Sequence, residues 1–174
     1  MKKLVIIGLS SLFFLSACGS DEAKETTDPA NGGEASTDNT EVKKELMRFY
    51  MEVPNTINET DGELNAFEQQ LEEGTLPEGE ELTALKEAAA VSAEETSQAV
   101  GTIEIPGALE EETEELQSAL AMISESYDLK VAALSEEETS FDAASEKFAE
   151  ADSVFNTILE EYELIPSSIQ NEVK

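Results

Sequence analysis

Apolar residues recur three and four positions apart through most of this chain, from about residue 41 to residue 165. That spacing places them along one face of an α-helix. No segment shows sustained alternation of apolar and polar residues, and Val and Ile are sparse, so a β-sheet is not expected. The pattern predicts an all-α fold.

The periodic residues form four blocks, at 46–71, 82–100, 109–134 and 141–162. Glycine or proline follows three of them, as expected after helix ends: Gly74 and Pro77, Gly101 and Pro106, and Pro166. Four amphipathic helices with short connections favour antiparallel neighbours, and we expect an up-down four-helix bundle over residues 41–165. A three-helix bundle with a split first helix is the alternative.

The first block has a weak start and an interrupted middle. Thr40 is placed to cap it, but Lys43 stands where a capping box requires Glu or Gln. Pro54 lies inside the block, yet the apolar register continues across it. We therefore expect one kinked helix, with a break at Val53 as the alternative. Asp61-Gly62 weakens the helix further.

The third and fourth blocks carry clearer start signals. Glu110, Glu111 and Glu112 open the third block, where the helix dipole favours negative charge. Ser135 with Glu138 matches the capping-box pattern and is the expected start of the fourth helix. Residues 102–105 are expected to form an extended connector, and residues 166–174 a C-terminal tail.

The N-terminus has the form of a signal peptide. Lys2 and Lys3 precede a largely apolar run at 4–15, which is too short to span a bilayer comfortably as a helix. The run ends in Leu15-Ser16-Ala17-Cys18, which contains the only cysteine of the chain. An ordinary secretory signal that has Cys18 near its cut site by chance is the alternative to the interpretation that follows.

Leu15-Ser16-Ala17-Cys18 resembles the lipobox of bacterial lipoproteins, in which the cysteine thiol is acylated and the chain is cut just before it. The resemblance implies that residues 1–17 are removed, with cleavage between Ala17 and Cys18. It also implies that acyl chains such as palmitate on Cys18 anchor the protein on the extracytoplasmic face of the cell membrane. The order of lipobox, acidic spacer and Ala/Glu-rich helices is similar to that of small helical lipoproteins of Gram-positive bacteria such as bacilli.

Residues 18–40 have the composition of a spacer. They are small and charged, and after Cys18 they include no aromatic and no branched aliphatic residue. Such a segment buries too little apolar surface to offset its ordering entropy, so we expect it to be disordered.

The charge balance narrows the range of partners. The chain has 40 acidic and 10 basic residues, and removal of residues 1–17 would take away two lysines and no acid. This field repels nucleic acid and anionic headgroups, while basic or cationic partners remain open. Most of the carboxylates are expected to form a solvated surface.

The residues that enzymes most often use are missing. There is no histidine, no Gly-Lys of a P-loop, and neither Gly-x-Ser-x-Gly nor Ser-x-x-Lys. Two carboxylates would suffice for a glycosidase, but a narrow bundle offers no sugar cleft, and tryptophan is absent. We therefore expect no enzyme activity, no catalytic residues and no cofactor.

One stretch comes close to a calcium-binding loop. With Gly62 at the obligatory glycine position, Glu59, Asp61 and Glu68 fall at ligand positions 3, 5 and 12. Ile57 then occupies position 1, where an Asp ligand belongs. A helix interrupted by a polar turn explains the stretch better, so no metal site is expected.

A few polar residues fall at or beside expected core positions, namely Asp61, Thr96, Thr113 and Lys130. If several of them met in one layer, they would form a buried polar site. The aromatic residues lie on the apolar faces and are expected in the core. Met47 and Met51 flank the apolar stripe of the first helix.

Two functions fit these observations. The first is a non-catalytic, membrane-anchored surface lipoprotein whose helices form a binding or structural module for an envelope protein. The alternative is a lipoprotein that binds a small ligand or cation at the membrane surface.

Overall fold

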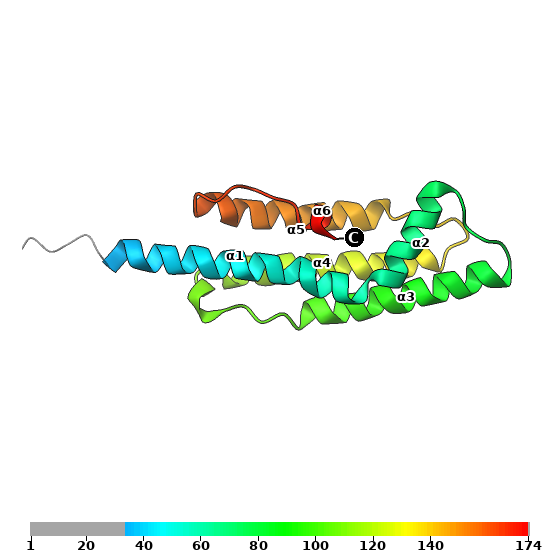
Figure 1. Ribbon diagram of the computed structural model, residues 1–174, viewed down its shortest axis with the longest axis horizontal. Helices are drawn as coiled ribbons and strands as arrows, with labels where there is room; N and C mark the ends of the chain where they lie inside the picture. Colours follow the sequence, from blue (N-terminus) through cyan, green and yellow to red (C-terminus); the bar gives the residue numbers. More distant parts are fainter. Residues whose placement is uncertain (1–33, 174) are drawn as a thin grey trace, which may run out of the picture. The chain divides into compact units, whose positions relative to one another are not determined.

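The computed structural model describes the backbone of residues 34–173 and the side chains of residues 39–173. Within this range the chain forms six α-helices and one short 3₁₀-helix, with no β-strand (Figure 1). This confirms the all-α fold. The expected signal peptide at 1–17, Cys18 and most of the expected spacer lie outside the described residues.

The first helix, α1 (Glu34–Thr60), begins seven residues before residue 41 and continues through Pro54. No glycine or proline lies between Glu34 and Thr40, so nothing stops the helix from extending into the expected spacer. The alternative break at Val53 is wrong, because Val53 and Ile57 both lie in the core and keep the register across the proline.

The interruption in the first block falls at Asp61, and α2 (Gly62–Glu73) follows it. The single kinked helix expected over 46–71 is therefore wrong in its second half. The Asp61 amide still donates to the Ile57 carbonyl at 3.0 Å, and the Asp61 carbonyl accepts from the Asn65 amide at 2.9 Å. Backbone bonds thus hold both sides of the joint, while α2 turns away from α1 (Figure 1). Left-handed Gly74 ends α2, as expected.

The third block begins later than its acidic residues suggested. After α3 (Glu80–Gly101), Pro106 begins a turn that contains η1 (Gly107–Leu109), and α4 (Thr113–Leu134) follows. Leu109 is fully buried and fixes this turn against the core. Glu110, Glu111 and Glu112 therefore precede α4, so the expectation that they form its first turn is wrong.

The expected capping box at Ser135 and Glu138 is also wrong. Ser135 instead ends α4, because Leu134 is buried and extends the apolar face of α4 up to that point. The next helix, α5 (Asp142–Glu161), begins after Ser140, whose hydroxyl accepts a hydrogen bond from the Asp142 amide at 3.3 Å.

The last long helix ends before the expected stop at Pro166. Glu163 adopts a left-handed backbone, and the Leu164 amide donates to the Leu159 carbonyl at 2.8 Å. This closes α5 in the manner of a Schellman turn. The expected tail then contains one further short helix, α6 (Ile169–Glu172), in which Ile169 is fully buried.

The helices pack around one apolar core. Helix α1 contacts α3, α3 contacts α4 and α4 contacts α5, while α2 lies on α3 and α6 lies against α1 and α5 (Figure 1). These contacts are compatible with a helical bundle. As expected, the aromatic side chains lie in the core or against it: Phe49, Tyr50, Phe67, Phe141, Tyr127, Phe148, Phe155 and Tyr162.

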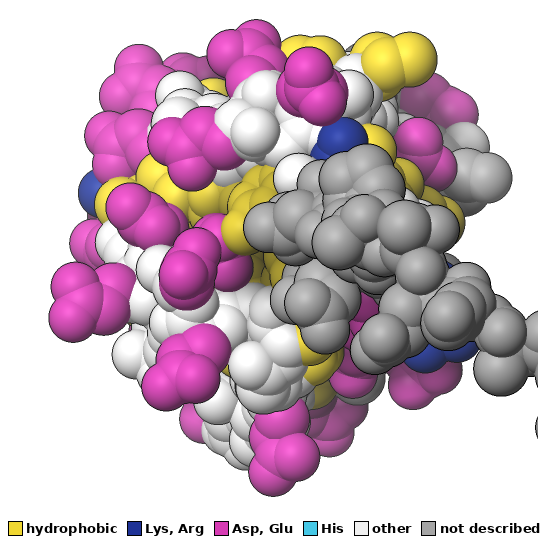
Figure 2. Space-filling view, turned by 90° about the vertical axis from the view of Figure 1, so that its left-hand side faces the viewer, with side chains coloured by type: hydrophobic (Ala, Val, Ile, Leu, Met, Phe, Trp, Pro, Cys, Tyr) yellow, Lys and Arg dark blue, Asp and Glu magenta, His cyan; other side chains and the backbone are white. Residues whose placement is uncertain are grey.

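The outer face of the helices is strongly acidic. On the face in Figure 2, Asp and Glu side chains surround smaller exposed apolar areas. Large apolar side chains that remain exposed in the described range include Met47 and Met51 on α1 and Val91 on α3. None of the described helices is both long enough and apolar enough to cross a membrane.

Candidate functional site

Charged and polar side chains meet in the interior at the joint between α1 and α2. Asp61 is only 1% exposed, and the Tyr127 hydroxyl of α4 donates to Asp61 Oδ2 at 3.5 Å. Lys130 follows Tyr127 by three residues, and its Nζ lies 2.7 Å from Glu68 Oε1 of α2. We refer to Asp61, Glu68, Tyr127 and Lys130 as the joint cluster.

Aromatic rings surround the ammonium of Lys130. Its Nζ lies 5.0 Å from the centre of the Tyr127 ring and 5.8 Å from that of the Phe141 ring. Both distances are within the range of cation–π attraction. The Lys130 side chain is 13% exposed and that of Glu68 is 28% exposed, so the ion pair is only partly screened by water.

Burial favours the neutral forms of Asp61 and Tyr127. It raises the pKa of Asp61 above its ordinary value, although a hydrogen bond from Asn65 and the charge of Lys130 oppose the rise. Burial also raises the pKa of Tyr127, and the negative charges of Asp61 and Glu68 add to that rise. Tyr127 is therefore a neutral hydrogen-bond donor at physiological pH.

Helix α3 clamps the same joint from the other side. The Ser92 hydroxyl donates to the Thr60 carbonyl at 2.7 Å and accepts from the Leu64 amide at 3.4 Å. The hydroxyls of Thr60 and Thr96 lie 2.8 Å apart. Ser92 thus satisfies backbone groups on both sides of the interruption, which fixes the angle between α1 and α2.

A cavity of about 240 Å³ opens beside the joint cluster. Four helices and the segment after α6 contribute its lining: Asn65, Glu68, Glu72, Tyr127, Lys130, Phe141, Ala144, Ser145, Phe148, Gln170 and Val173. Gln170 and Val173 come from the C-terminal segment. The sequence did not predict that this segment forms a wall of the site, because residues 166–174 were expected to be a tail.

Asp152 of α5 holds that C-terminal segment in place. Its carboxylate accepts from the Ser168 hydroxyl at 2.6 Å and from the Ile169 amide at 2.9 Å. Asn58 of α1 donates to the Glu172 carbonyl at 3.0 Å. Together with buried Ile169, these bonds make α6 a fixed wall of the cavity.

A second buried polar contact joins α5 to the turn before α4. The Tyr162 hydroxyl donates to Glu112 Oε1, and Glu112 is buried. Burial raises the pKa of Tyr162, and the neighbouring Glu112 carboxylate reinforces the rise. This pair anchors one end of α5 and does not line the cavity.

The structure brings together some of the polar residues that the sequence placed in the core. Asp61 and Lys130 belong to the joint cluster, and Thr96 bonds to the residue before Asp61. Thr113 lies elsewhere and donates to the Leu109 carbonyl at 3.1 Å. Sequence reasoning missed Ser92 as a clamp. The Glu68–Lys130 ion pair was not predicted either, because local sequence patterns do not show that α2 lies close to α4.

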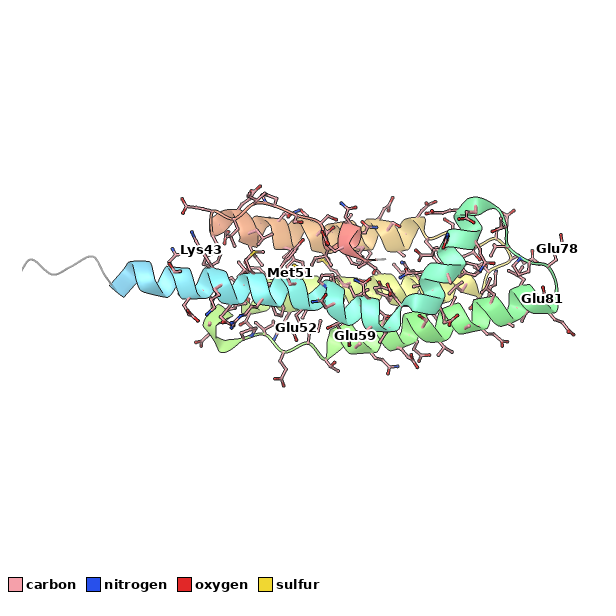
Figure 3. All side chains as sticks on the ribbon, in the orientation of Figure 1. Lys43, Met51, Glu52, Glu59, Glu78 and Glu81 are labelled. Carbon is pink, nitrogen blue, oxygen red and sulfur yellow. The ribbon has the colours of Figure 1, made fainter. Side chains whose placement is uncertain are left out.

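Of the residues in the near-match to a calcium loop, only Asp61 and Glu68 come together, in the joint cluster. Ile57 lies in the core of α1, Glu59 is exposed on α1 (Figure 3), and Glu68 pairs with Lys130. Within residues 39–173, no three His, Cys, Asp or Glu side chains are grouped so that they could hold a metal ion. Ala17 and Cys18, the expected cleavage and lipidation residues, lie outside the described part of the chain.

Comparison with known proteins returns no relative: no family model, curated protein or solved structure matches this chain. Its function is therefore inferred from its own residues.

Proposed function

We propose that this protein is a lipoprotein anchored to the extracytoplasmic face of the cell membrane through acyl chains on Cys18. Its helical domain is a non-catalytic binding or structural module for another envelope protein. The observation that carries the proposal is Leu15-Ser16-Ala17-Cys18, at the end of the apolar run at 4–15. Two or more acyl chains hold a protein stably on a membrane without a spanning helix.

The arrangement of the long helices supports a compact module. We propose that α1, α3, α4 and α5 form an up-down four-helix bundle, with α2 and α6 packed on its side. The sequential contacts of α1 with α3, α3 with α4 and α4 with α5 support this topology. Such a bundle presents helix faces rather than a deep cleft, which suits protein contacts better than catalysis.

The chemistry of the interior also supports a non-catalytic role. The joint cluster is held by internal pairs, with Lys130 on Glu68 and Tyr127 on Asp61. The pKa of Tyr127 is raised, so its hydroxyl is a poor base or nucleophile at neutral pH. These contacts serve to fix the angle of the joint.

The anchor is tested by following the chain in bacterial cells supplied with a labelled fatty acid. We expect the wild-type chain to carry the label and to fractionate with membranes, and Cys18→Ser to lose the label and accumulate outside the membrane fraction or as uncleaved precursor. Ser20→Ala, two residues away, is the matched control and should behave as wild type. Equal labelling of wild type and Cys18→Ser would contradict the proposal.

The partner is tested by photo-crosslinking in the same cells. The exposed apolar residues Met51 and Val91 are positions for a photoreactive amino acid, and Glu81 on the acidic surface serves as control (Figure 3). A binding module should give one adduct of defined mass from an apolar position and none from Glu81. Absence of any adduct from both Met51 and Val91 would contradict an envelope partner on these faces.

A second candidate function is a lipoprotein that binds a small ligand or cation at the membrane surface. The cavity beside the joint cluster is the observation that favours it. Such a protein gains stability with saturating ligand, by RT ln(1 + [L]/Kd), whereas a pure protein-binding module does not respond to small molecules. Thermal melting with and without ligand therefore separates the two.

A further inference from the structure

We propose that the cavity between α2, α4, α5 and the C-terminal segment binds a small organic ammonium compound, a primary amine of a few carbon atoms. Its ammonium would pair with Glu72, and its carbon chain would lie against the aromatic wall. This inference develops the second candidate function and does not depend on the lipid anchor.

The size and walls of the cavity suit such a ligand. Its volume of about 240 Å³ equals that of roughly eight waters, enough for a molecule with a few heavy atoms. Phe148 of α5, Phe141 directly before α5 and Tyr127 of α4 form part of the wall. Small-molecule sites between the helices of a bundle commonly combine apolar walls with a few convergent polar groups.

The structure already contains one ammonium in this environment. The Nζ of Lys130 lies over the rings of Tyr127 and Phe141 and pairs with Glu68. The protein thus holds its own alkylammonium here with a carboxylate and the faces of aromatic rings. A ligand bound beside Lys130 would use Glu72 for its ammonium and the aromatic wall for its carbon chain. A divalent metal ion, which prefers several oxygen ligands, gains little from such rings.

The charge of the lining leaves one carboxylate for the ligand. The charged residues of the lining are Glu68, Glu72 and Lys130, so the lining has one negative charge in excess. Glu68 is taken by Lys130, and among residues 39–173 no basic side chain pairs with Glu72. Glu72 is exposed at the rim of the cavity, where a ligand's ammonium can reach it from water. An anionic ligand would instead meet two carboxylates.

The binding experiment uses the full chain purified in detergent and calorimetric titration with propylammonium chloride at roughly 150 mM salt, which screens diffuse attraction to the acidic surface. We expect saturable binding with one site for propylammonium and none for propionate. Calcium chloride should give no saturable heat at the same concentrations.

Variants on α2 locate the site. Glu72→Gln should weaken propylammonium binding by about tenfold or more, because one charge-assisted contact is lost. Glu73→Gln removes the same charge from the neighbouring exposed position and should leave the affinity unchanged. Both replacements lie on the surface, so thermal melting should confirm that both variants fold.

Three results would overturn the inference: no saturable propylammonium binding, equal weakening by Glu72→Gln and Glu73→Gln, or propionate binding as tightly as propylammonium. Because the readout is binding to purified protein, its failure is distinct from a failure of Cys18 to carry lipid.

Discussion

Two parts of the interior differ in the kind of side chain that they contain. Around Phe155 of α5, the core consists of rings: the Phe155 ring centre lies 6.3 Å from that of Phe49 and 5.9 Å from that of Tyr50. The joint cluster, by contrast, contains a partly buried ion pair of Lys130 and Glu68 and a buried hydrogen bond from Tyr127 to Asp61. We refer to Phe49, Tyr50 and Phe155 as the ring cluster.

The difference lies in what each cluster does for the fold. Burial of the ring cluster removes large apolar areas from water and contributes stability directly. Burial of the joint cluster costs desolvation energy, which its ion pair and hydrogen bonds offset. The ring cluster therefore determines how stable the helical domain is, and the joint cluster determines where α2 lies and which chemistry lines the cavity.

The largest expected effect comes from the ring cluster. Phe155→Ala should lower the free energy of unfolding by about 3–5 kcal/mol, because the side chain is fully buried and leaves a cavity. Urea denaturation followed by circular dichroism measures this loss. A change below about 1 kcal/mol would show that the ring cluster does not dominate the core.

Removal of the cation from the joint cluster should cost less. Lys130→Met leaves the buried Glu68 Oε1 without its partner, and we expect a loss of about 1–3 kcal/mol. Lys44→Met removes a lysine whose side chain is 53% exposed, so the same urea experiment should show little change. If the two variants lost equal stability, the Lys130 pair would be no more important than a surface ion pair.

The clamp from α3 is expected to contribute about 1 kcal/mol. Ser92→Ala removes the hydroxyl that bonds backbone groups on both sides of Asp61. The bond to the Thr60 carbonyl, at 2.7 Å, supplies most of this energy, because the bond from the Leu64 amide is long at 3.4 Å. Faster hydrogen exchange of the Leu64 amide should accompany the loss of stability. Ser118→Ala, at an exposed position of α4, is the control. Unchanged Leu64 exchange in Ser92→Ala would refute the clamp.

The smallest effect concerns the buried carboxyl and depends on pH. Because folding raises the pKa of Asp61, the folded state binds its proton more tightly than the unfolded chain does. The stability linked to this group is therefore present at low pH and is lost as pH rises from 3.8, the ordinary value, through the folded pKa.

Asp61→Asn removes the free-energy cost of burying an ionised carboxylate at this position. At pH 7 the variant should be more stable than wild type by less than about 1 kcal/mol, and the difference should vanish below about pH 3. Comparison of the two chains across pH cancels the contribution of the other carboxylates. A variant that is less stable than wild type at pH 7 would mean that the Lys130 and Asn65 contacts outweigh burial.

The sequence predicted the long helices better than their ends. Helix α3 lies within two residues of its expected block on each side, because Gly101 and the following Pro106 are strong local signals. The Ser135–Glu138 pattern failed since the core continued α4 to Leu134. Pro54 did not break α1 since Val53 before it and Ile57 three residues after it are both apolar and buried. Tertiary packing overrode the local signals at these positions.

Only part of the candidate site could be predicted from the sequence. Asp61 and Lys130 stood out as polar residues at core positions, and Tyr127 fell on an apolar face. Their meeting depends on α2 lying near α4 and on α6 closing the cavity, which no local pattern specifies. Lys130 follows Tyr127 by three residues, a spacing that places both on one helix face.

The central proposal is that lipid on Cys18 holds the helical domain at the membrane, and intact mass spectrometry of the mature protein from cells tests it most directly. The account predicts a chain that begins at Cys18 and carries the added mass of its acyl chains. A mature chain that begins elsewhere, or that begins at Cys18 with the mass of the bare polypeptide, would contradict it.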